Sequence, residues 1–382
     1  MSKKYIIGIN ASFTPSGGSL TQIVNMVRYL SAAENLELVI YSKKKNNSIF
    51  NNINLGNHKI VLSFLSNISA LSRVIWEQLF LPFYVIRDRI DVLFCPGDIS
   101  PIYSSVKKVQ WIGTVGPFWE NIFDFDIGFL RRIKYPLAKL LIYKSAERAD
   151  HVIFESQYQQ KLFLKRYNIS KDNNSVINIG KDVFFTSIPT NIESSYSSQQ
   201  PYALCVSHLY PYKNIPRMIR CFYRANIKLN NKYRLLIAGA FKSKKYTKKI
   251  NNEIQKHNYS QYITLLGSVS KESLRDLYQN TELLIFPSHC ESCGYILVEA
   301  MSMGVPIVCS NSTAMPDTCG NAAIYFDPYN SDDMEEKIYN TIDNPEEKSK
   351  LKLRSLARAN SMPSYKEATE QTMNIFMRLV NE

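Results

Sequence analysis

Strand-like and helix-like segments alternate along nearly the whole chain of 382 residues, and this alternation restricts the fold more than any other feature. Apolar runs of strand length recur, and segments such as 20–30, with apolar residues at the spacing of one helical face, separate several of them. Strands that alternate with helices form parallel sheets with helices on both faces. The sequence therefore predicts an α/β fold of the doubly wound, Rossmann-like type.

The expected strands fall into two groups separated by a polar segment. They are 5–10, 36–42, 59–64, 92–97, 108–115, 151–156 and 175–180, then 203–207, 234–240, 263–267, 283–288, 305–310 and 322–326. The segment between them, "TSIPTNIESSYSSQQP", is rich in Ser and Asn and contains proline near both ends, which is typical of a linker. In doubly wound sheets ligands bind beyond the carboxyl ends of the strands, so the cleft between two such domains is the expected active site.

These patterns predict four parts of the chain. They are a first Rossmann-like domain (1–185), a linker (186–201), a second Rossmann-like domain (202–360), and a final helix (361–382) that can pack back on the first domain.

The composition is that of a soluble folded protein, with 45% hydrophobic and 21% charged residues. No apolar run approaches the ~18 residues needed to cross a bilayer, and the N-terminus lacks the apolar core and cleavage site of a signal peptide. Most of the seven cysteines sit in apolar, strand-like runs, a poor disulfide framework. We therefore expect a cytoplasmic protein.

The net charge of +13 is concentrated in the first half, where residues 1–190 hold 23 Lys and Arg against 14 Asp and Glu. Such a surface can meet nucleic acid, an anionic membrane or phosphorylated substrates, or it can simply be solvated. We find no nucleic-acid recognition motif. Segment 129–148 interleaves basic with apolar residues, so it can rest on anionic lipid or be an ordinary helix with a solvated basic edge.

The stretch "SHCESCGYILVEAMSMG" (288–304) carries two candidate chemistries. Cys290 and Cys293 form a C-x-x-C, which occurs in zinc sites and thiol redox pairs. No second ligand pair lies nearby, and the motif does not follow the first strand of a small domain, so both interpretations are disfavoured. Glu291 and Glu299 offer two carboxylates that suit a polyhydroxylated ligand, although a lone Glu299 could equally be a surface residue.

The pattern around this stretch predicts a strand to Ser288, a turn, a helix from about Gly294 to Met303, and Gly304 at the helix C′ position. The N–H groups and the positive dipole end of that helix then point toward the carboxyl edge of the sheet. Glu299, on the second turn, leans back toward the same place. This geometry suits a phosphate or sugar oxygen.

With these residues in place, the second half resembles the family-four glycosyltransferases, which are retaining, nucleotide-sugar-dependent enzymes of the GT-B fold. The resemblance rests on "FPSHCESCGYILVEAMSMGVPIVCSNSTAMPDTCGNAAIYFDP" (286–328), "LCVSHLYPYKNIPRMI" (204–219) and "HVIFESQYQQKLFLKRYNISKDNNSVINIGKDVF" (151–184). Over 1–140 it rests only on architecture and on "SGGSL" (16–20).

The resemblance implies that the first domain (1–185) lies on the acceptor side and that the second (202–360) binds the nucleotide sugar. It also implies a role for each matching position. Lys213 would bind the donor diphosphate, Glu299 the ribose hydroxyls and Glu291 the donor sugar, which makes Lys213 and Glu291 the expected catalytic pair. Further donor contacts would come from backbone N–H groups near the second-domain helix and from a glycine pair in the first loop, namely Gly294, Tyr295, Ile296, Leu297, Gly17 and Gly18.

The sequence departs from the family pattern at three positions. His208 replaces the usual arginine five residues before the lysine, so phosphate binding would depend more on Lys213. Cys293 replaces a usual aromatic residue. Gly113 or Thr114 stands where many members have a histidine, so we expect acceptor contacts from 116–123 instead.

The resemblance thus predicts a retaining, metal-independent hexosyltransferase that uses a nucleoside-diphosphate sugar and no cofactor. "DFD" (124–126) matches a metal-binding Asp-x-Asp only superficially. If 129–148 meets the membrane, the natural acceptor is a polyprenyl-diphosphate-linked saccharide at the inner face of the plasma membrane, and the process is bacterial O-antigen or capsule-type polysaccharide synthesis. The alternatives are a catalytically silent nucleotide-sugar-binding subunit and a basic nucleic-acid-binding protein.

Overall fold

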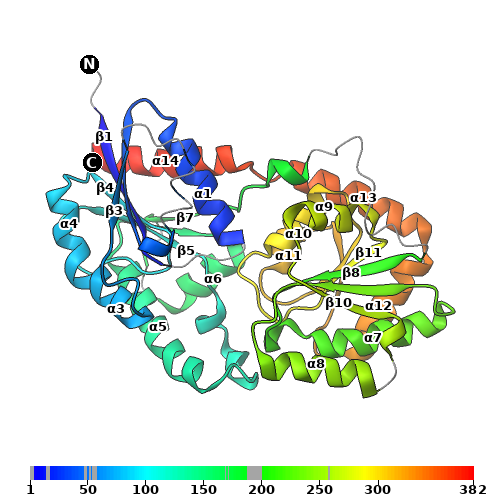
Figure 1. The fold of residues 1–382 in the computed structure, drawn as a ribbon. Helices are drawn as coiled ribbons and strands as arrows, with labels where there is room; N and C mark the ends of the chain where they lie inside the picture. Colours follow the sequence, from blue (N-terminus) through cyan, green and yellow to red (C-terminus); the bar gives the residue numbers. More distant parts are fainter. Residues whose placement is uncertain are drawn as a thin grey trace. The chain divides into compact units, whose positions relative to one another are not determined.

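The computed structural model describes residues 4–13, 18–46, 50, 53, 58–167, 169–170, 172–186, 200–256 and 259–382. The chain divides into two compact units, each built around one sheet (Figure 1). The first unit consists of Met1–Phe118, Leu130–Gly180 and Pro363–Glu382, and the second of Trp119–Phe129 and Lys181–Met362. Most of the expected linker, 187–199, lies outside the described residues.

The first unit contains a seven-stranded parallel sheet in the order β3-β2-β1-β4-β5-β6-β7. Its strands are β1 (Tyr5–Ala11), β2 (Leu36–Ser42), β3 (Lys59–Leu62), β4 (Val92–Cys95), β5 (Lys107–Ile112), β6 (His151–Phe154) and β7 (Asn174–Val176). Its helices are α1 (Gly18–Ser31), α3 (Ala70–Ile75), the π-helix η2 (Trp76–Phe80), α4 (Leu81–Arg87), α5 (Phe129–Glu147), α6 (Gln157–Arg166) and α14 (Tyr365–Asn381), with short 3₁₀ turns η1 (Lys44–Asn46) and η3 (Gly116–Phe118).

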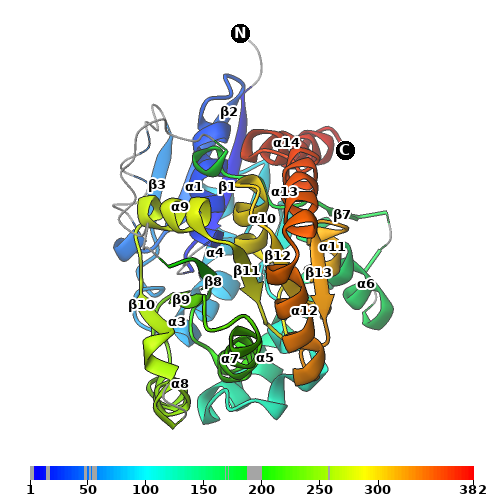
Figure 2. The same ribbon diagram turned by 90° about the vertical axis from the view of Figure 1, so that its right-hand side faces the viewer.

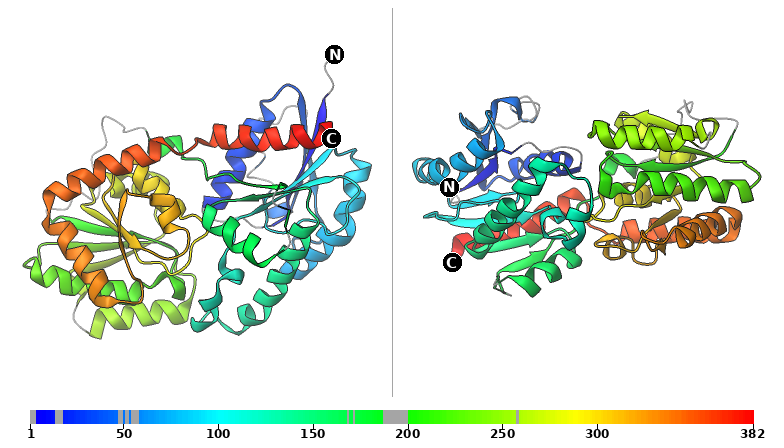
Figure 3. Two further views of the ribbon diagram at one scale, coloured as in Figure 1. Left: turned by 180° about the vertical axis from the view of Figure 1, so that it is seen from behind. Right: turned by 90° about the horizontal axis from the view of Figure 1, so that it is seen from below.

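The last helix, α14, belongs to the core of the first unit. Its Phe376 packs 5.3 Å from Phe94 of β4, measured between ring centroids, and a capping box between Ser364 and Glu367 fixes its start. Figure 3 shows α14, in red, running beside α1 within this unit. The chain end therefore completes the core that the first strands begin.

The second unit contains a six-stranded parallel sheet in the order β10-β9-β8-β11-β12-β13. Its strands are β8 (Tyr202–Val206), β9 (Arg234–Ala238), β10 (Ile263–Gly267), β11 (Leu283–Phe286), β12 (Ile307–Ser310) and β13 (Ala323–Phe326). Its helices are α7 (Ile215–Lys228), α8 (Lys244–Lys256), α9 (Lys271–Asn280), α10 (Tyr295–Ser302), α11 (Met315–Cys319), α12 (Ser331–Asp343) and α13 (Pro345–Asn360), with η4 (Glu120–Asp124), η5 (Val183–Phe185), η6 (Pro211–Lys213) and η7 (Tyr259–Gln261).

Helices cover both faces of the second sheet, because its strands bury alternate side chains on opposite sides. Leu235 and Ile237 of β9 join a cluster with α7, α8 and α12, whereas Leu236 and Ala238 join one with α9, α10, α11 and α13. In Figure 2 the first group of helices lies below the strands and the second above them. The predicted doubly wound α/β fold class is confirmed.

Residues 119–129 differ from the expected domain division. The sequence placed them in the first domain, but they pack with the second unit. The physical reason is aromatic packing, because Trp119 and Phe125 both contact the ring of His289, which follows β11.

Candidate functional site

Lys213 is held on a tight turn at the carboxyl end of β8. Pro211 starts the 3₁₀ turn η6, and the amide of Lys213 donates to the carbonyl oxygen of Tyr210 at 2.9 Å. Asn214 ends the turn in the left-handed region with φ of 59°, and its Nδ2 donates to the carbonyl of Pro328 at 3.0 Å. The lysine is thus fixed between β8 and α7 rather than carried on a loose loop.

Glu291 reaches the same place from the loop between β11 and α10. The amide of His289 donates to the carbonyl of Tyr212 at 2.9 Å, and the amide of Glu291 donates to Thr313 Oγ1 at 3.0 Å. These bonds bring Glu291 Oε1 into direct contact with Lys213 Nζ. The side chains are only 13% and 15% exposed, so the ion pair is largely removed from water. The structure therefore joins the two predicted catalytic residues.

Aromatic rings form one side of this ion pair. Lys213 Nζ lies 5.3 Å from the ring centroid of Tyr212 and 5.7 Å from that of Phe286. Both distances fall within the range of cation–π attraction. The ammonium group consequently has a fixed position at the carboxyl edge of the second sheet.

The amino end of α10 begins at Gly294, as the sequence predicted to within one residue. Gly294 has φ of +74°, and a Cβ there would lie 2.9 Å from Leu297 Cδ1, so only glycine fits without strain. The amide of Leu297 donates to the carbonyl of Gly294 at 2.9 Å. Leu297 therefore uses its N–H inside the helix here, and Tyr295 and Ile296 are the first helical residues of the predicted backbone donors.

Glu299 lies on the second turn of α10 and makes a separate contact with α9. Tyr278 donates its hydroxyl to Glu299 Oε2 at 3.2 Å. Burial, with a smaller contribution from the nearby Asp182, raises the pKa of Glu299 to about 7 against the opposing effects of Tyr278 and Lys271. Asp182 itself pairs with Lys271 at 2.5 Å. A carboxyl that titrates near neutrality is suited to hydroxyl groups, because it can accept or donate hydrogen bonds.

His208 brings no positive charge to this site at neutral pH. Burial, together with Lys242 and Lys213, lowers the pKa of its imidazole. Its Nδ1 accepts from the amide of Ala240 at 3.4 Å, which places the proton of the neutral ring on Nε2. This agrees with the expectation that binding of the donor phosphate would depend more on Lys213 than on His208. The neutral imidazole of His208 keeps one N–H group that can donate a hydrogen bond.

The other predicted positions are in the first loop and in "DFD". Gly17 lies outside the described residues, and Gly18 is the first residue of α1. Asp126 of "DFD" pairs with Lys245 at 2.6 Å on the surface of the second unit.

The two cysteines of the C-x-x-C are buried beside the site. Burial raises the pKa of the Cys290 thiol well above its usual range, which disfavours the thiolate that metals and redox partners require. In the described part of the chain no three His, Cys, Asp or Glu side chains gather as metal ligands.

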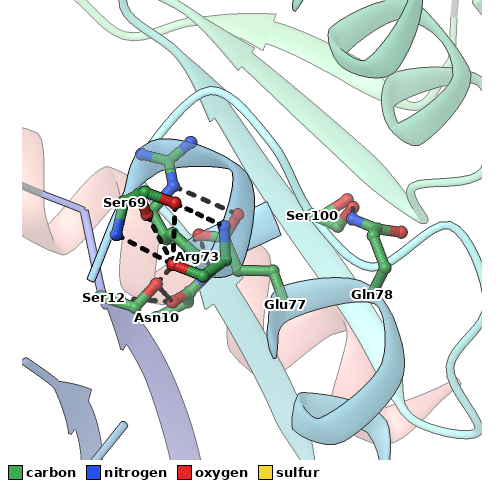
Figure 4. A network of polar contacts seen from close by, with 8 residues as sticks. Asn10, Ser12, Ser69, Arg73, Glu77, Gln78 and Ser100 are labelled. Carbon is green, nitrogen blue, oxygen red and sulfur yellow. Dashed lines mark hydrogen bonds and ion pairs between the residues drawn. The ribbon is translucent and has the colours of Figure 1, made fainter. Parts of the chain in front are cut away.

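A second polar cluster, which the sequence analysis missed, lies in the first unit (Figure 4). Glu77, on the π-helix η2, is fully buried and accepts from Asn10 Nδ2 at 3.1 Å and Ser12 Oγ at 2.9 Å, both just at the end of β1. Arg73 Nε lies 3.5 Å from its second oxygen. Burial raises the pKa of Glu77. The sequence feature that could have predicted this cluster is a glutamate inside the apolar run "VIWEQLF".

Asp98, which follows β4, is a second acidic residue at this edge of the first sheet. It accepts from the amides of Gly113 at 2.8 Å and Thr114 at 3.0 Å, and burial raises its pKa to about 6. These are the positions where the sequence lacks the family's usual histidine. Fully buried Glu77 and half-buried Asp98 thus lie near this edge of the first sheet, and the π-helix that carries Glu77 is a feature often found at functional sites.

The part of the chain that carries this site is similar to a known family. Residues 188–358, which include Lys213, Glu291 and Glu299, match the family model described as glycosyl transferases group 1. Among solved structures, Alr3699/HepE from Anabaena in complex with UDP-glucose superposes with a TM-score of 0.76 at 15% sequence identity, over 98% of this chain and 99% of that chain. At this identity the likeness shows the fold alone, and it confirms the GT-B architecture.

Two curated relatives share sequence with the chain. O-antigen chain mannosyltransferase B from Escherichia coli is 29% identical over 180 residues, 47% of this chain and 46% of that protein. O-antigen chain mannosyltransferase RfbU from Salmonella typhimurium is 24% identical over 207 residues, 54% of each chain. The chain therefore spans about half the length of the curated relatives it matches. The family resemblance drawn from the sequence motifs is confirmed.

Proposed function

We propose that this chain, whose residues 188–358 are a glycosyl transferases group 1 domain, transfers a hexosyl group from a nucleoside-diphosphate sugar to a saccharide acceptor in bacterial O-antigen or capsule-type polysaccharide synthesis. The Lys213–Glu291 pair at the carboxyl edge of the second sheet carries the proposal. Two relatives named as O-antigen mannosyltransferases make mannose the first sugar to test.

The proposed chemistry is a displacement with retention at the anomeric carbon. Lys213 stabilises the negative charge that builds on the diphosphate as its bond to the sugar breaks. Glu291 orients the sugar, and a departing diphosphate oxygen takes the proton of the acceptor hydroxyl as the new bond forms on the same face. The protein contributes position and preorganised charge, without a covalent intermediate. A product with inverted anomeric configuration, measured by NMR, would contradict this mechanism.

The charge of Lys213 supports a reaction without a metal ion, because an ammonium group can neutralise the leaving diphosphate. We expect purified protein to keep its activity in excess chelator. Loss of activity with chelator and recovery with magnesium or manganese would contradict metal independence.

The first experiment on function is a panel of nucleoside-diphosphate sugars, with GDP-mannose and UDP-glucose included. A donor that binds the native state raises the melting temperature by mass action. Release of nucleoside diphosphate by pure protein distinguishes an enzyme from a silent binding subunit. Thermal stabilisation without turnover in the presence of any saccharide acceptor would favour the silent subunit.

The exposed surface of the first unit supports an acceptor held at an anionic membrane. Along α3, η2 and α4, Leu71, Ile75, Leu79, Phe83 and Ile86 recur at helical spacing and are 40–71% exposed. Contiguous exposed apolar surface of this kind marks interaction sites.

Helix α5 adds charge to this apolar surface. Within the first unit, four of its apolar side chains are 51–67% exposed and are interleaved with basic residues; they are Leu130, Ile133, Leu137 and Leu140. Val74 of α3 and Leu141 of α5 pack against the same buried cluster, so both segments border that cluster. No helix in the described ranges is long and apolar enough to span a membrane. We therefore propose peripheral binding at the inner face, with a polyprenyl-diphosphate-linked acceptor.

Vesicle cosedimentation tests this membrane proposal. Vesicles that contain phosphatidylglycerol should bind the protein at low salt, and high salt should weaken binding, since attraction of basic residues to anionic lipid is screened. Phe83→Ser should reduce binding, whereas Phe241→Ser, which removes an equally large side chain that is 52% exposed in the second unit, should not. Equal binding to neutral vesicles, or none at low salt, would contradict the proposal.

A further inference from the structure

Residues 119–129, here called the strap, are anchored in the second unit although they follow the first unit in the sequence. Trp119, Ile122 and Ile127 are 9%, 1% and 6% exposed. The aromatic rings of Trp119 and Phe125 stack on each other with centroids 5.4 Å apart. Three buried side chains and one aromatic stack therefore anchor the strap to the second unit, while most of its other residues are exposed.

The strap packs on His289, two residues before Glu291. The imidazole centroid lies 6.3 Å from Trp119 at an interplanar angle of 22°, 4.9 Å from Phe125, and 4.5 Å from Tyr329. Asn121 Nδ2 donates to the hydroxyl of Tyr329 at 3.3 Å and joins the strap to the other side of the ring. His289 is 3% exposed, so aromatic side chains surround it.

Packing, more than hydrogen bonding, holds the imidazole in place. Within the described residues, His289 Nδ1 is buried and has no hydrogen-bond partner. Burial lowers the pKa of the ring to about 4, and Arg217 adds to this shift, so the ring is neutral at pH 7. A neutral, aromatic ring inside a box of aromatic rings acts as a packing element.

The backbone of His289 connects this aromatic box to both members of the ion pair. Its amide donates to the carbonyl of Tyr212, the residue before Lys213, at 2.9 Å. Its carbonyl accepts from Ser312 Oγ at 2.8 Å. A displacement of His289 would therefore shift the turn that holds Lys213 and the loop that holds Glu291 together.

We propose that the strap positions the Lys213–Glu291 pair through His289, which makes Trp119, Phe125 and His289 positioning residues for the transfer. The proposal rests on the proposed function, in which Lys213 and Glu291 contact the donor. A displacement of about 1 Å at a reacting group can lower a rate about 100-fold. The strap is thus a part of the second-unit site that the sequence order assigns to the other half of the chain.

Hydrogen exchange and kinetics together test whether the strap positions the ion pair. Trp119→Ala and His289→Ala should lower kcat about 10-fold to 100-fold with donor in excess. They should also speed amide exchange in the 207–214 and 289–294 peptides. His289→Phe keeps the ring and removes the nitrogens, so it should retain kcat within about 3-fold and leave exchange in both peptides near that of the wild type.

A matched control separates positioning from general loss of stability. Tyr223→Ala removes an aromatic contact of the same unit, the Tyr223–Tyr259 pair at 3.9 Å, which is not part of the site. It should lower the melting temperature but change neither kcat nor exchange in the two peptides. Unchanged amide exchange of the two peptides in Trp119→Ala, or a kcat loss no larger than that of Tyr223→Ala, would overturn the proposed positioning role of the strap. The exchange readout still decides the matter if wild-type protein transfers no sugar, which would refute the proposed function separately.

Discussion

The Lys213–Glu291 ion pair allows the proposed site to be tested by paired substitutions. Lys213→Met removes the ammonium group and keeps the length of the side chain, and Glu291→Gln removes the charge and keeps the shape. Because the side chains are only 13% and 15% exposed, each single change leaves a mostly buried charge without its partner. The double variant leaves no charge unpaired.

The expected stability changes follow from this burial. Removing one partner of a buried ion pair costs about 3–5 kcal/mol, and some residual exposure moves the expectation to the lower end, about 2–4 kcal/mol. Removing both partners should cost less than either single change, because the desolvation of two charges is also removed. Calorimetry should show a fall in melting temperature of roughly 5–10 °C for Lys213→Met and a smaller fall for the double variant.

The expected loss of transition-state stabilisation is similar in size to the loss of stability. Each single variant should lose about 10²–10³ in kcat with donor in excess, which corresponds to roughly 3–4 kcal/mol of transition-state stabilisation. The double variant should lose much less than the product of the two, since residues that act as a unit are not additive.

A second ion pair in the same unit provides the control. Lys348 and Glu282 lie 2.6 Å apart with side chains 14% and 39% exposed, away from the predicted donor residues. Lys348→Met should lower the melting temperature and leave kcat within about 2-fold of the wild type. Near-wild-type turnover in both Lys213→Met and Glu291→Gln, or a rate loss in Lys348→Met of the same size, would refute the assignment.

Three further predictions concern residues near the two sheets. Because the pKa of Glu299 is raised in the folded state, its ionisation destabilises that state as pH rises from about 4.5 to about 7. Glu299→Gln should therefore raise the melting temperature at pH 8 and leave it unchanged at pH 4. A fall in melting temperature at pH 8 would contradict this. Replacing Cys290 and Cys293 by alanine should lower stability but retain transfer activity, and loss of activity in a folded double variant would revive a thiol role. Glu77→Ala should cost about 3–5 kcal/mol in urea unfolding of the first unit, and Glu77→Gln should cost less because it keeps an acceptor for Asn10 and Ser12; equal costs would argue against the hydrogen-bond network.

The sequence predicts the fold and the main site loops because both depend on local patterns. Apolar runs predict the strands. The two ends of α10 follow from Gly294 before the helix and Gly304 after it, which adopt φ of +74° and +66°. Lys213 and Glu291 were both expected near a donor. Their direct contact was not predicted, because 78 positions separate them in sequence and the contact depends on how two βα loops pack.

The partners of Glu299 and the place of the strap depend on packing alone. Glu299 is on α10, Lys271 begins α9, and Asp182 comes just before η5. These three residues lie close together only because the segments pack in the folded chain, and no spacing in the sequence predicts that packing. Trp119 lies in an aromatic stretch that reads equally well as surface or as core. Its burial depends on contact with the ring of His289, in the loop after β11 and more than 150 positions later in the sequence.

Under the proposed function, the ion pair would let one site serve both binding and release. Glu291 pairs with Lys213, so a diphosphate bound there would compete with a carboxylate for the same ammonium group. Glu291→Gln removes the competitor, and should therefore bind a nucleoside diphosphate without sugar more tightly than the wild type while transferring sugar more slowly. Calorimetric titration against turnover measures both. If Glu291→Gln binds the diphosphate more weakly, Glu291 assists the phosphate site and does not compete with it. The opposite signs follow from charge alone, because a carboxylate repels the product that Lys213 attracts and so favours its release after transfer.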